Sequence, residues 1–211
     1  MRYLIYSDVH GNLPAFETIL QEAGHCDGHI CLGDLVNYGP WSNECVDLAI
    51  SLGNSVLIKG NHEDAFIKGF YPGTNQLVQK FFLETFPKFE RTKIIAGFIH
   101  EYVLGDFVFL HTIKSRNIYS DSDLTLDKNY IIGHSHHQFK IENNGYVLYN
   151  SGSVGQNRQY INVANYLIFN SETNSIDMRF SRYNLEVLLN KMKVSGYPEE
   201  CIQYYKQKRC Y

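Results

Sequence analysis

The chain has 211 residues, of which 44% are hydrophobic and 19% are charged, and its formal net charge at pH 7 is −3. This composition is typical of one globular domain, residues 1–211, with a full core. No apolar run reaches the roughly 20 residues that a membrane helix needs, so we expect no membrane partner. The net charge is slightly negative, whereas nucleic-acid-binding proteins typically carry an excess of basic residues, so we do not expect a nucleic-acid partner either.

Strand and helix patterns alternate in the first part of the chain. Short apolar runs predict strands, and helical periodicity predicts the helices between them. The predicted strands are 3–7, 30–32 and 56–58, and the predicted helices are 13–23, 42–52 and 76–86. Asn12 and Ser42 are the expected N-caps of the first two helices.

Short runs separated by turns dominate the second part. They predict strands at 98–103, 107–110, 130–132, 139–142, 146–149, 166–169 and 176–180, with hairpin turns at 104–107 and 142–145 and helices at 185–194 and 199–208. A βαβαβ half followed by a hairpin half predicts an α/β fold, a four-layer α/β/β/α sandwich of two mixed sheets. Between the predicted strands 107–110 and 130–132, the polar, strand-poor stretch 114–127 predicts a loop that covers a site.

Five of these apolar runs end in residue types that bind metals. Parallel strands deliver such side chains to the carboxyl edge of a sheet, so we expect them to meet. The candidate ligands are Asp8, His10, Asp34, Asn61, His111, His134 and His136. This oxygen and imidazole set lacks thiolates and suits two divalent ions, manganese first and otherwise Fe, Ni or Zn, and it disfavours Mg and Ca, which prefer oxygen ligands throughout.

Asp34 has two carboxylate oxygens and is the expected bridge between the ions. Asp8, His10 and His136 would then face the first ion, and the other three residues the second. Two divalent ions, two carboxylates and a bridging hydroxide leave net positive charge, which favours an anionic substrate. A bridging hydroxide could then attack the phosphorus of a phosphate ester.

His62 directly follows Asn61 and has two readings. It either donates a proton to the leaving group, or holds Asp34 or Asn61 in place. The histidines at 25, 29, 100 and 137 are interpreted as core or surface residues, and the basic run 206–209 as a solvated helix end.

Several motifs resemble the calcineurin-like metallophosphoesterases. They are SDVHGN (7–12), GDLVNYGP (33–40), GNHE (60–63), FLHT (109–112) and GHSHH (133–137), while NSGSVGQNR (150–158) is similar to a segment of the small bacterial and archaeal phosphodiesterase branch. The resemblance implies a four-layer sandwich and a dinuclear centre on the seven candidate ligands, and it favours the catalytic reading of His62. Thr112 replaces the usual glycine, and Ser151 and Asn157 replace prolines.

Three residues are expected at the substrate. Arg158 would neutralise phosphate from outside the metal centre, or else pair with an acidic neighbour. Asn37 and Tyr38 would line the pocket, with Tyr38 either stacking on an aromatic group or packing in its loop.

The predicted function is a metal-dependent phosphoesterase acting on a small phosphodiester or phosphomonoester. One alternative is a dinucleoside tetraphosphatase or serine/threonine protein phosphatase, although those resemble G-D-x-V-D-R-G, and Tyr38 stands where their arginine would be. The alternative of another class is a non-catalytic metal-binding interaction scaffold, and the acidic charge disfavours a nuclease.

The cysteine count and the aromatic content bear on location and assembly. Five cysteines without C-x-x-C spacing favour reduced thiols, and Met1 leads directly into a strand with no room for a signal peptide. We therefore expect a cytoplasmic protein, and the 16 tyrosines and 13 phenylalanines are compatible with a homodimer.

Overall fold

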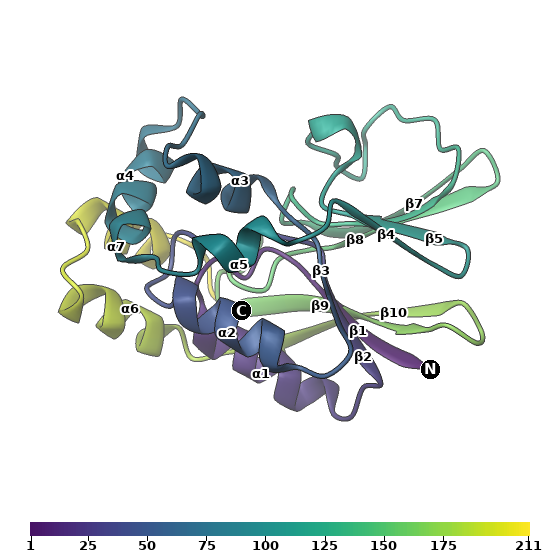
Figure 1. Cartoon of the computed structure of the whole chain (residues 1–211), viewed down its shortest axis with the longest axis horizontal. Coiled ribbons are helices and arrows are strands. Elements are labelled where there is room, and N and C mark those ends of the chain that lie inside the picture. The colour runs from purple at the N-terminus through teal and green to yellow at the C-terminus, as the bar shows by residue number, and fades with distance from the viewer.

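The computed structural model describes all 211 residues and contains two mixed five-stranded sheets packed face to face (Figure 1). The first sheet has the order β10-β9-β1-β2-β3. Its strands are β1 (Arg2–Tyr6), β2 (Gly28–Cys31), β3 (Ser55–Leu57), β9 (Val163–Asn170) and β10 (Ser175–Arg182). β1, β2 and β3 are parallel, whereas β9 and β10 run antiparallel to their neighbours.

The second sheet has the order β4-β5-β6-β8-β7. Its strands are β4 (Glu101–Leu104), β5 (Phe107–Leu110), β6 (Asn129–Ile132), β7 (Gln138–Asn143) and β8 (Tyr146–Ser151). Here β5, β6 and β8 are parallel, and β4 and β7 are antiparallel edge strands. Each sheet therefore has three parallel strands whose carboxyl ends share one edge.

The helices cover the first sheet and extend beyond the edge where its parallel strands end. They are α1 (Leu13–Ala23), α2 (Ser42–Ser51), α3 (Asn61–Lys68), α4 (Gln76–Thr85), α5 (Thr92–Ala96), α6 (Leu185–Val194) and α7 (Glu199–Lys206), with short 3₁₀ helices η1 (Phe86–Lys88) and η2 (Ile113–Ser115). α1 and α2 lie on the outer face of the first sheet, and α4, α6 and α7 gather at one end of the molecule (Figure 1). None of the helices combines the length and the apolar character needed to cross a bilayer.

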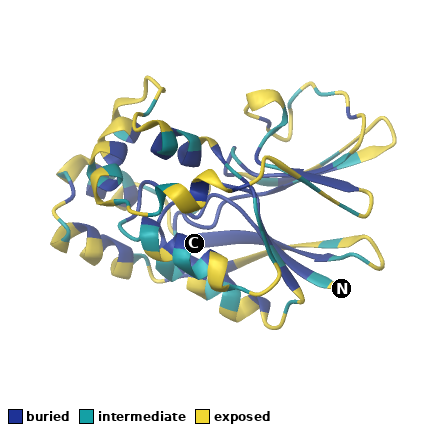
Figure 2. Ribbon diagram, viewed as in Figure 1, coloured by how far each residue is buried: buried dark blue, intermediate teal, exposed yellow.

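Alternating side chains of the strands build separate cores on the two faces of each sheet. Residues such as Ile5, Ile30, Phe109 and Phe169 meet between the sheets. Figure 2 shows these inner strands as buried and the outward helix faces as exposed. On the outer face of the second sheet, Ile118 and Leu126 of the predicted loop are buried, so that loop takes the place of a full helical layer.

Most predicted elements are confirmed, but one predicted cap is wrong, one predicted strand begins later, and two helices were not predicted. Asn12 caps α1 by accepting from the Ala15 N–H at 3.3 Å. The Ser42 cap is wrong, because Trp41 is the N-cap of α2 and the Ser42 hydroxyl instead accepts from the Asn37 N–H at 3.1 Å. The strand predicted at 98–103 begins only at 101, because Ile99 forms just an isolated bridge. The helices α3 and α5 were not predicted from the sequence.

Candidate metal centre

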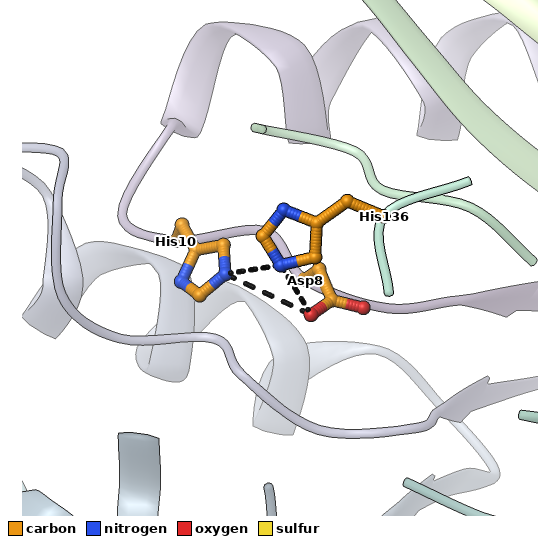
Figure 3. A group of neighbouring side chains, drawn as sticks. All are labelled: Asp8, His10 and His136. Carbon is orange, nitrogen blue, oxygen red and sulfur yellow. Dashed lines mark hydrogen bonds and ion pairs between the residues drawn. The ribbon is translucent and has the colours of Figure 1, made fainter. Parts of the chain in front are cut away.

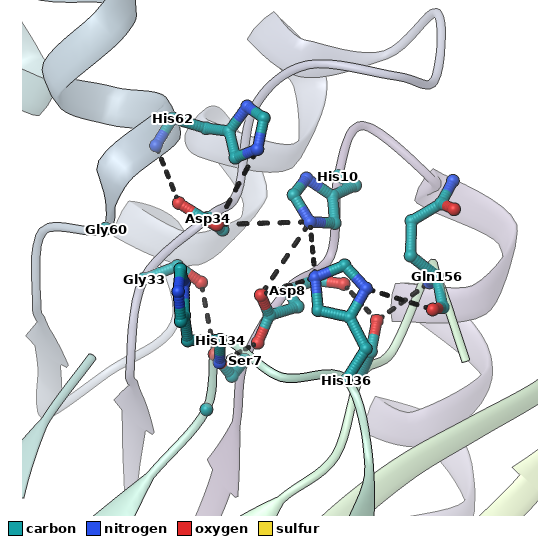
Figure 4. A network of polar contacts seen from close by, with 12 residues as sticks. Ser7, Asp8, His10, Gly33, Asp34, Gly60, His62, His134, His136 and Gln156 are labelled. Carbon is teal, nitrogen blue, oxygen red and sulfur yellow. Dashed lines mark hydrogen bonds and ion pairs between the residues drawn. The ribbon is translucent and has the colours of Figure 1, made fainter. Parts of the chain in front are cut away.

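All seven candidate ligands lie at the shared edge of the two sheets. Each follows a parallel strand within a few residues, so loops from both sheets meet there (Figure 4). The ligand atoms of the six aspartates and histidines, together with the His62 ring, form three overlapping groups whose members lie within 4.8 Å of one another. These groups are Asp8–His10–His136, His10–Asp34–His62 and Asp34–His111–His134.

Asp8, His10 and His136 form the first side of the site (Figure 3). The Asp8 Oδ1 atom lies 3.0 Å from His136 Nε2 and 3.7 Å from His10 Nε2, and the two Nε2 atoms are 3.2 Å apart. All three side chains are buried. The other carboxylate oxygen of Asp8 accepts from the His134 N–H at 2.9 Å, so Oδ1 is the oxygen aimed at the centre.

Asp34 connects this side to the second one. Its Oδ2 lies 3.3 Å from His111 Nε2 and 4.0 Å from His10 Nε2. His111 Nε2 is also 3.1 Å from Asn61 Oδ1 and 3.1 Å from His134 Nδ1. Asp34 is thus the one carboxylate that faces ligands of both sides.

Main-chain carbonyls orient three of the imidazoles. Their Nδ1 atoms lie 2.9–3.1 Å from carbonyl oxygens, with His10 on Val36, His111 on Leu32 and His136 on Gln156. An N–H at Nδ1 leaves the Nε2 lone pair pointing to the centre, which is the arrangement of a metal-bound histidine.

The centre therefore contains acceptors that face one another. Asp8 Oδ1 is fully buried without a hydrogen-bond partner, and a buried orphan oxygen is costly unless something positive binds it. The donor set of carboxylate, amide oxygen and imidazole fits divalent cations of the Mn, Fe, Ni and Zn type. These residues consequently fit a metal centre better than a hydrogen-bonded polar cluster.

The titration of the imidazoles supports this interpretation. Burial lowers the pKa of His134 to about 4, and burial with the nearby His62 and His136 lowers the pKa of His10 well below its usual value. Burial also opposes charging of His111, but the Asp34 charge and hydrogen bond outweigh it and raise the pKa of His111 to about 10. In the metal-free chain one proton on His111 partly balances the carboxylates, and a bound cation would displace it.

The ligand loops have unusual backbone geometry. Asp8, His10, Asp34, His134 and His136 all have positive φ, between 51° and 70°. For residues with a Cβ this conformation is uncommon, and it is typically retained at functional sites at a cost of about 1–3 kcal/mol each. Gly33 at φ +112 lets the chain pass His111, because a Cβ there would lie 2.8 Å from His111 Nδ1.

Glu63 holds the Asp34 loop, and sequence reasoning missed this role. Its buried carboxylate accepts from the N–H groups of Asp34 (2.8 Å), Leu35 (2.7 Å), Val36 (3.4 Å) and Gly60 (2.8 Å). Burial, together with the Asp34 charge, raises the pKa of Glu63 to about 7. The signal was available in GNHE, because a glutamate at the third helical position commonly bonds back to the N-cap.

We expect Glu63→Gln to lower the free energy of unfolding by about 1–3 kcal/mol, because the amide nitrogen cannot accept from the N–H groups that the lost oxygen bonded. Urea unfolding followed by circular dichroism measures this change. Glu22→Gln, at an exposed position of α1, is the matched control. Equal unfolding midpoints for the two variants would contradict the role assigned to Glu63.

His62 lies beside the ligands and is fixed from two directions. Its main-chain N–H donates to Asp34 Oδ1 at 2.9 Å, and its Nε2 lies 4.0 Å from Asp34 Oδ2 (Figure 4). Its Nδ1 accepts from the Asn37 amide at 2.9 Å, and Asn37 in turn accepts from the Thr85 hydroxyl at 3.0 Å. Burial lowers the pKa of His62, so the neutral ring has its proton on Nε2, toward the centre.

The three residues expected at the substrate differ in exposure. Asn37 is fully buried against His62, so it supports that ring rather than lining an open pocket. Tyr38 is only 4% exposed and packs on the rings of His10 (4.7 Å) and His62 (5.5 Å). Of the two roles considered for Tyr38, this arrangement agrees with packing inside the protein. Arg158 is exposed, and its guanidinium donates to the Tyr204 hydroxyl at 2.9 Å.

A cavity of about 350 Å³ opens beside the second side of the site, where His111 and His134 lie. Asn61, His111 and His134 form part of its lining, and Lys59 and Lys114 add positive charge. Ser115 also lines it, so the first residues of the stretch 114–127 border the cavity, whereas Ile118 and Leu126 of the same stretch pack on the second sheet. The cavity thus gives an anionic ligand access to the centre.

Comparisons with known proteins agree with this geometry. The model of the calcineurin-like phosphoesterase family matches residues 1–175. An uncharacterised protein of Methanocaldococcus jannaschii, MJ0912, is 28% identical over 92% of this chain and 93% of its own length. The crystal structure of a metallophosphoesterase from Sphaerobacter thermophilus has a TM-score of 0.81 at 25% identity, covering 98% of both chains. The hypothetical protein PH1004 from Pyrococcus horikoshii shares the fold, with a TM-score of 0.76 at 14% identity over 97% of both chains.

Proposed function

Because the chain belongs to the calcineurin-like phosphoesterase family and is a metal-dependent phosphoester hydrolase, we propose that it hydrolyses a small phosphodiester at a centre of two divalent cations. The seven side chains Asp8, His10, Asp34, Asn61, His111, His134 and His136 would hold the two cations. The observation that carries this proposal is the pair of ligand groups joined by Asp34, in which buried acceptors face one another.

The cations would supply Lewis acidity toward the phosphate and lower the pKa of a water beside phosphorus. The chain supplies the arrangement around them. Main-chain carbonyls orient three of the candidate imidazole ligands, and Glu63 fixes the loop of Asp34. Such preorganised donors and charges are the usual main source of stabilisation in phosphoryl transfer.

His62 is the proposed proton donor to the leaving oxygen: with substrate bound the ring would be the imidazolium, the oxygen of the Asn37 amide would accept from Nδ1–H, and loss of the Nε2 proton to the leaving oxygen would return the ring to its neutral state. Its Nε2–H points toward the centre because Asn37 occupies Nδ1, and Thr85 holds the amide of Asn37 in turn. Its contact to Asp34 runs through the main chain, so the ring itself remains available. Both readings of His62 therefore apply, the backbone as a support for Asp34 and the ring as an acid.

The two competing functions fit less well. Tyr38 stands at the position of the arginine of protein phosphatases and dinucleoside tetraphosphatases, and its buried phenol ring does not supply the charge of a guanidinium. A scaffold without activity would not need five candidate ligands in strained backbone conformations, since that strain has a cost in stability. We therefore favour hydrolysis of a small diester.

The test uses metal-stripped protein reconstituted with Mn²⁺, Ni²⁺, Zn²⁺ or Mg²⁺. Hydrolysis of bis-p-nitrophenyl phosphate and of p-nitrophenyl phosphate is followed by nitrophenolate absorbance, and bound metal is counted by mass spectrometry. We expect two equivalents of metal and metal-dependent turnover of the diester, faster with Mn²⁺ than with Mg²⁺ because the site contains imidazoles. Turnover of the monoester alone would replace the diester proposal, and tight binding of one ion would refute the two-metal centre.

A further inference from the structure

Two cationic side chains that are far apart in the sequence converge near the metal centre. Arg158 lies in the loop after β8, and Lys208 follows α7. The Lys208 ammonium lies 4.8 Å from the centre of the Tyr204 ring, and the hydroxyl of the same ring accepts from Arg158 Nη1 at 2.9 Å. The Ile161 N–H donates to the Arg209 carbonyl at 2.8 Å, which ties the two segments together.

Neither cation has an acidic partner. Five other lysine and arginine side chains pair with carboxylates, namely Lys80, Lys88, Arg91, Lys140 and Arg179, and the rest, like Arg158 and Lys208, have no ion pair. Burial, with the charge of Arg158, lowers the pKa of Lys208. Two like charges held close together without a counterion are unfavourable until an anion binds between them.

The pair is linked to the first side of the metal centre. The Tyr204 hydroxyl that accepts from Arg158 donates to Gln156 Oε1 at 3.0 Å, and the carbonyl of Gln156 lies 3.0 Å from His136 Nδ1. The Tyr204 ring also lies 6.4 Å from Tyr38, which packs on His10 at 4.7 Å. The tyrosine contacts thus place the cations next to the ligand shell but outside it.

We propose that Arg158 and Lys208 together bind a second phosphate group of the substrate, which is not the one hydrolysed. The guanidinium offers a planar pair of donors, held in place by Tyr204, and the ammonium adds a point charge. The substrate class is then a phosphodiester that carries a further phosphate. This inference rests on the proposed function and assigns a role to Lys208, one residue of the basic run 206–209.

The test compares two probes that differ by one phosphate. They are thymidine 5′-(p-nitrophenyl phosphate) and the same compound with a 3′-phosphate, hydrolysed by the Mn²⁺-loaded protein. We expect kcat/KM to be about tenfold or more higher for the 3′-phosphorylated probe, as for a hydrogen bond to a charged group. Lys208→Gln should bring the ratio close to one, and Lys208→Arg should largely retain it.

Lys206→Gln is the matched control, because it removes the same charge from the exposed end of α7 and should keep the ratio of wild type. An equal kcat/KM for both probes in wild type, or the same ratio in Lys208→Gln as in wild type, would overturn the subsite while leaving the diesterase intact. If neither diester is hydrolysed, the proposed function fails. The subsite is then judged by calorimetry with thymidine 3′,5′-bisphosphate and thymidine 5′-phosphate, where equal affinities refute it and tighter binding of the bisphosphate, lost in Lys208→Gln, supports it.

Discussion

We expect Asp34→Asn to lower metal-dependent diester hydrolysis by at least about 100-fold. Removing a residue that only hydrogen-bonds to a metal ligand typically costs about 10–100-fold, and loss of a ligand itself should cost more. Asp34 is the one carboxylate that faces both sides of the centre, with Oδ2 3.3 Å from His111 Nε2 and 4.0 Å from His10 Nε2. Asparagine has one oxygen instead of two and no charge. It would therefore bind one cation at most, and an amide N–H would face a ligand nitrogen or the His62 N–H.

Bound metal and activity should be measured on the same sample of this variant. Asp121→Asn is the matched control, because it removes a carboxylate from an exposed position without ion pairs or hydrogen bonds. The control should retain two metal equivalents and full turnover. An Asp34→Asn protein that is folded, retains both ions and turns over the diester normally would refute the bridging role.

His62→Ala should reduce kcat by about 10²–10⁴-fold, the range for loss of general acid catalysis. The reduction should grow as the leaving group becomes a poorer one, because a poor leaving oxygen needs the proton most. Diesters that release p-nitrophenol and phenol provide this comparison. The His62 ring is buried, and its Nδ1 is already bonded to Asn37, so Nε2 is the nitrogen left to act.

Two further variants separate catalysis from structure at this position. His25→Ala removes a histidine whose side chain is 91% exposed and should leave kcat unchanged. Asn37→Ala should lower kcat less than His62→Ala does, because it frees the ring without removing it. If His62→Ala gives the same loss with both leaving groups, His62 does not donate the proton but stabilises charge or supports Asp34.

The ligand set was predictable because both sheets end in the same way. Each of the parallel strands β1, β2, β3, β5 and β6 is followed within four residues by a candidate donor, and the structure brings all seven predicted residues to one edge. The order of strands in the two sheets was not predictable from these runs, since pairing between distant segments depends on tertiary packing.

The supporting residues were harder to predict, for physical reasons. Serine is a common N-cap residue, but the Ser42 hydroxyl accepts from the Asn37 N–H instead, a contact that exists only once the loop 33–42 is folded. α3 has only 8 residues and begins at the ligand Asn61 itself, so its apolar face is too short for periodicity to reveal. The positive φ of Asp8, His10, Asp34, His134 and His136 is uncommon for residues with a Cβ and is imposed by the whole site.

The carbonyl oxygens that orient His10, His111 and His136 belong to Val36, Leu32 and Gln156, and this has a consequence for how the protein tolerates change. Every amino acid brings the same carbonyl, so the side chains at these three positions can be exchanged as far as packing allows without altering the imidazole tautomers. A deletion or insertion of a single residue in one of these loops would shift the carbonyl away from its ring. The centre is therefore robust to replacement of these neighbours and sensitive to the length of the loops that carry them.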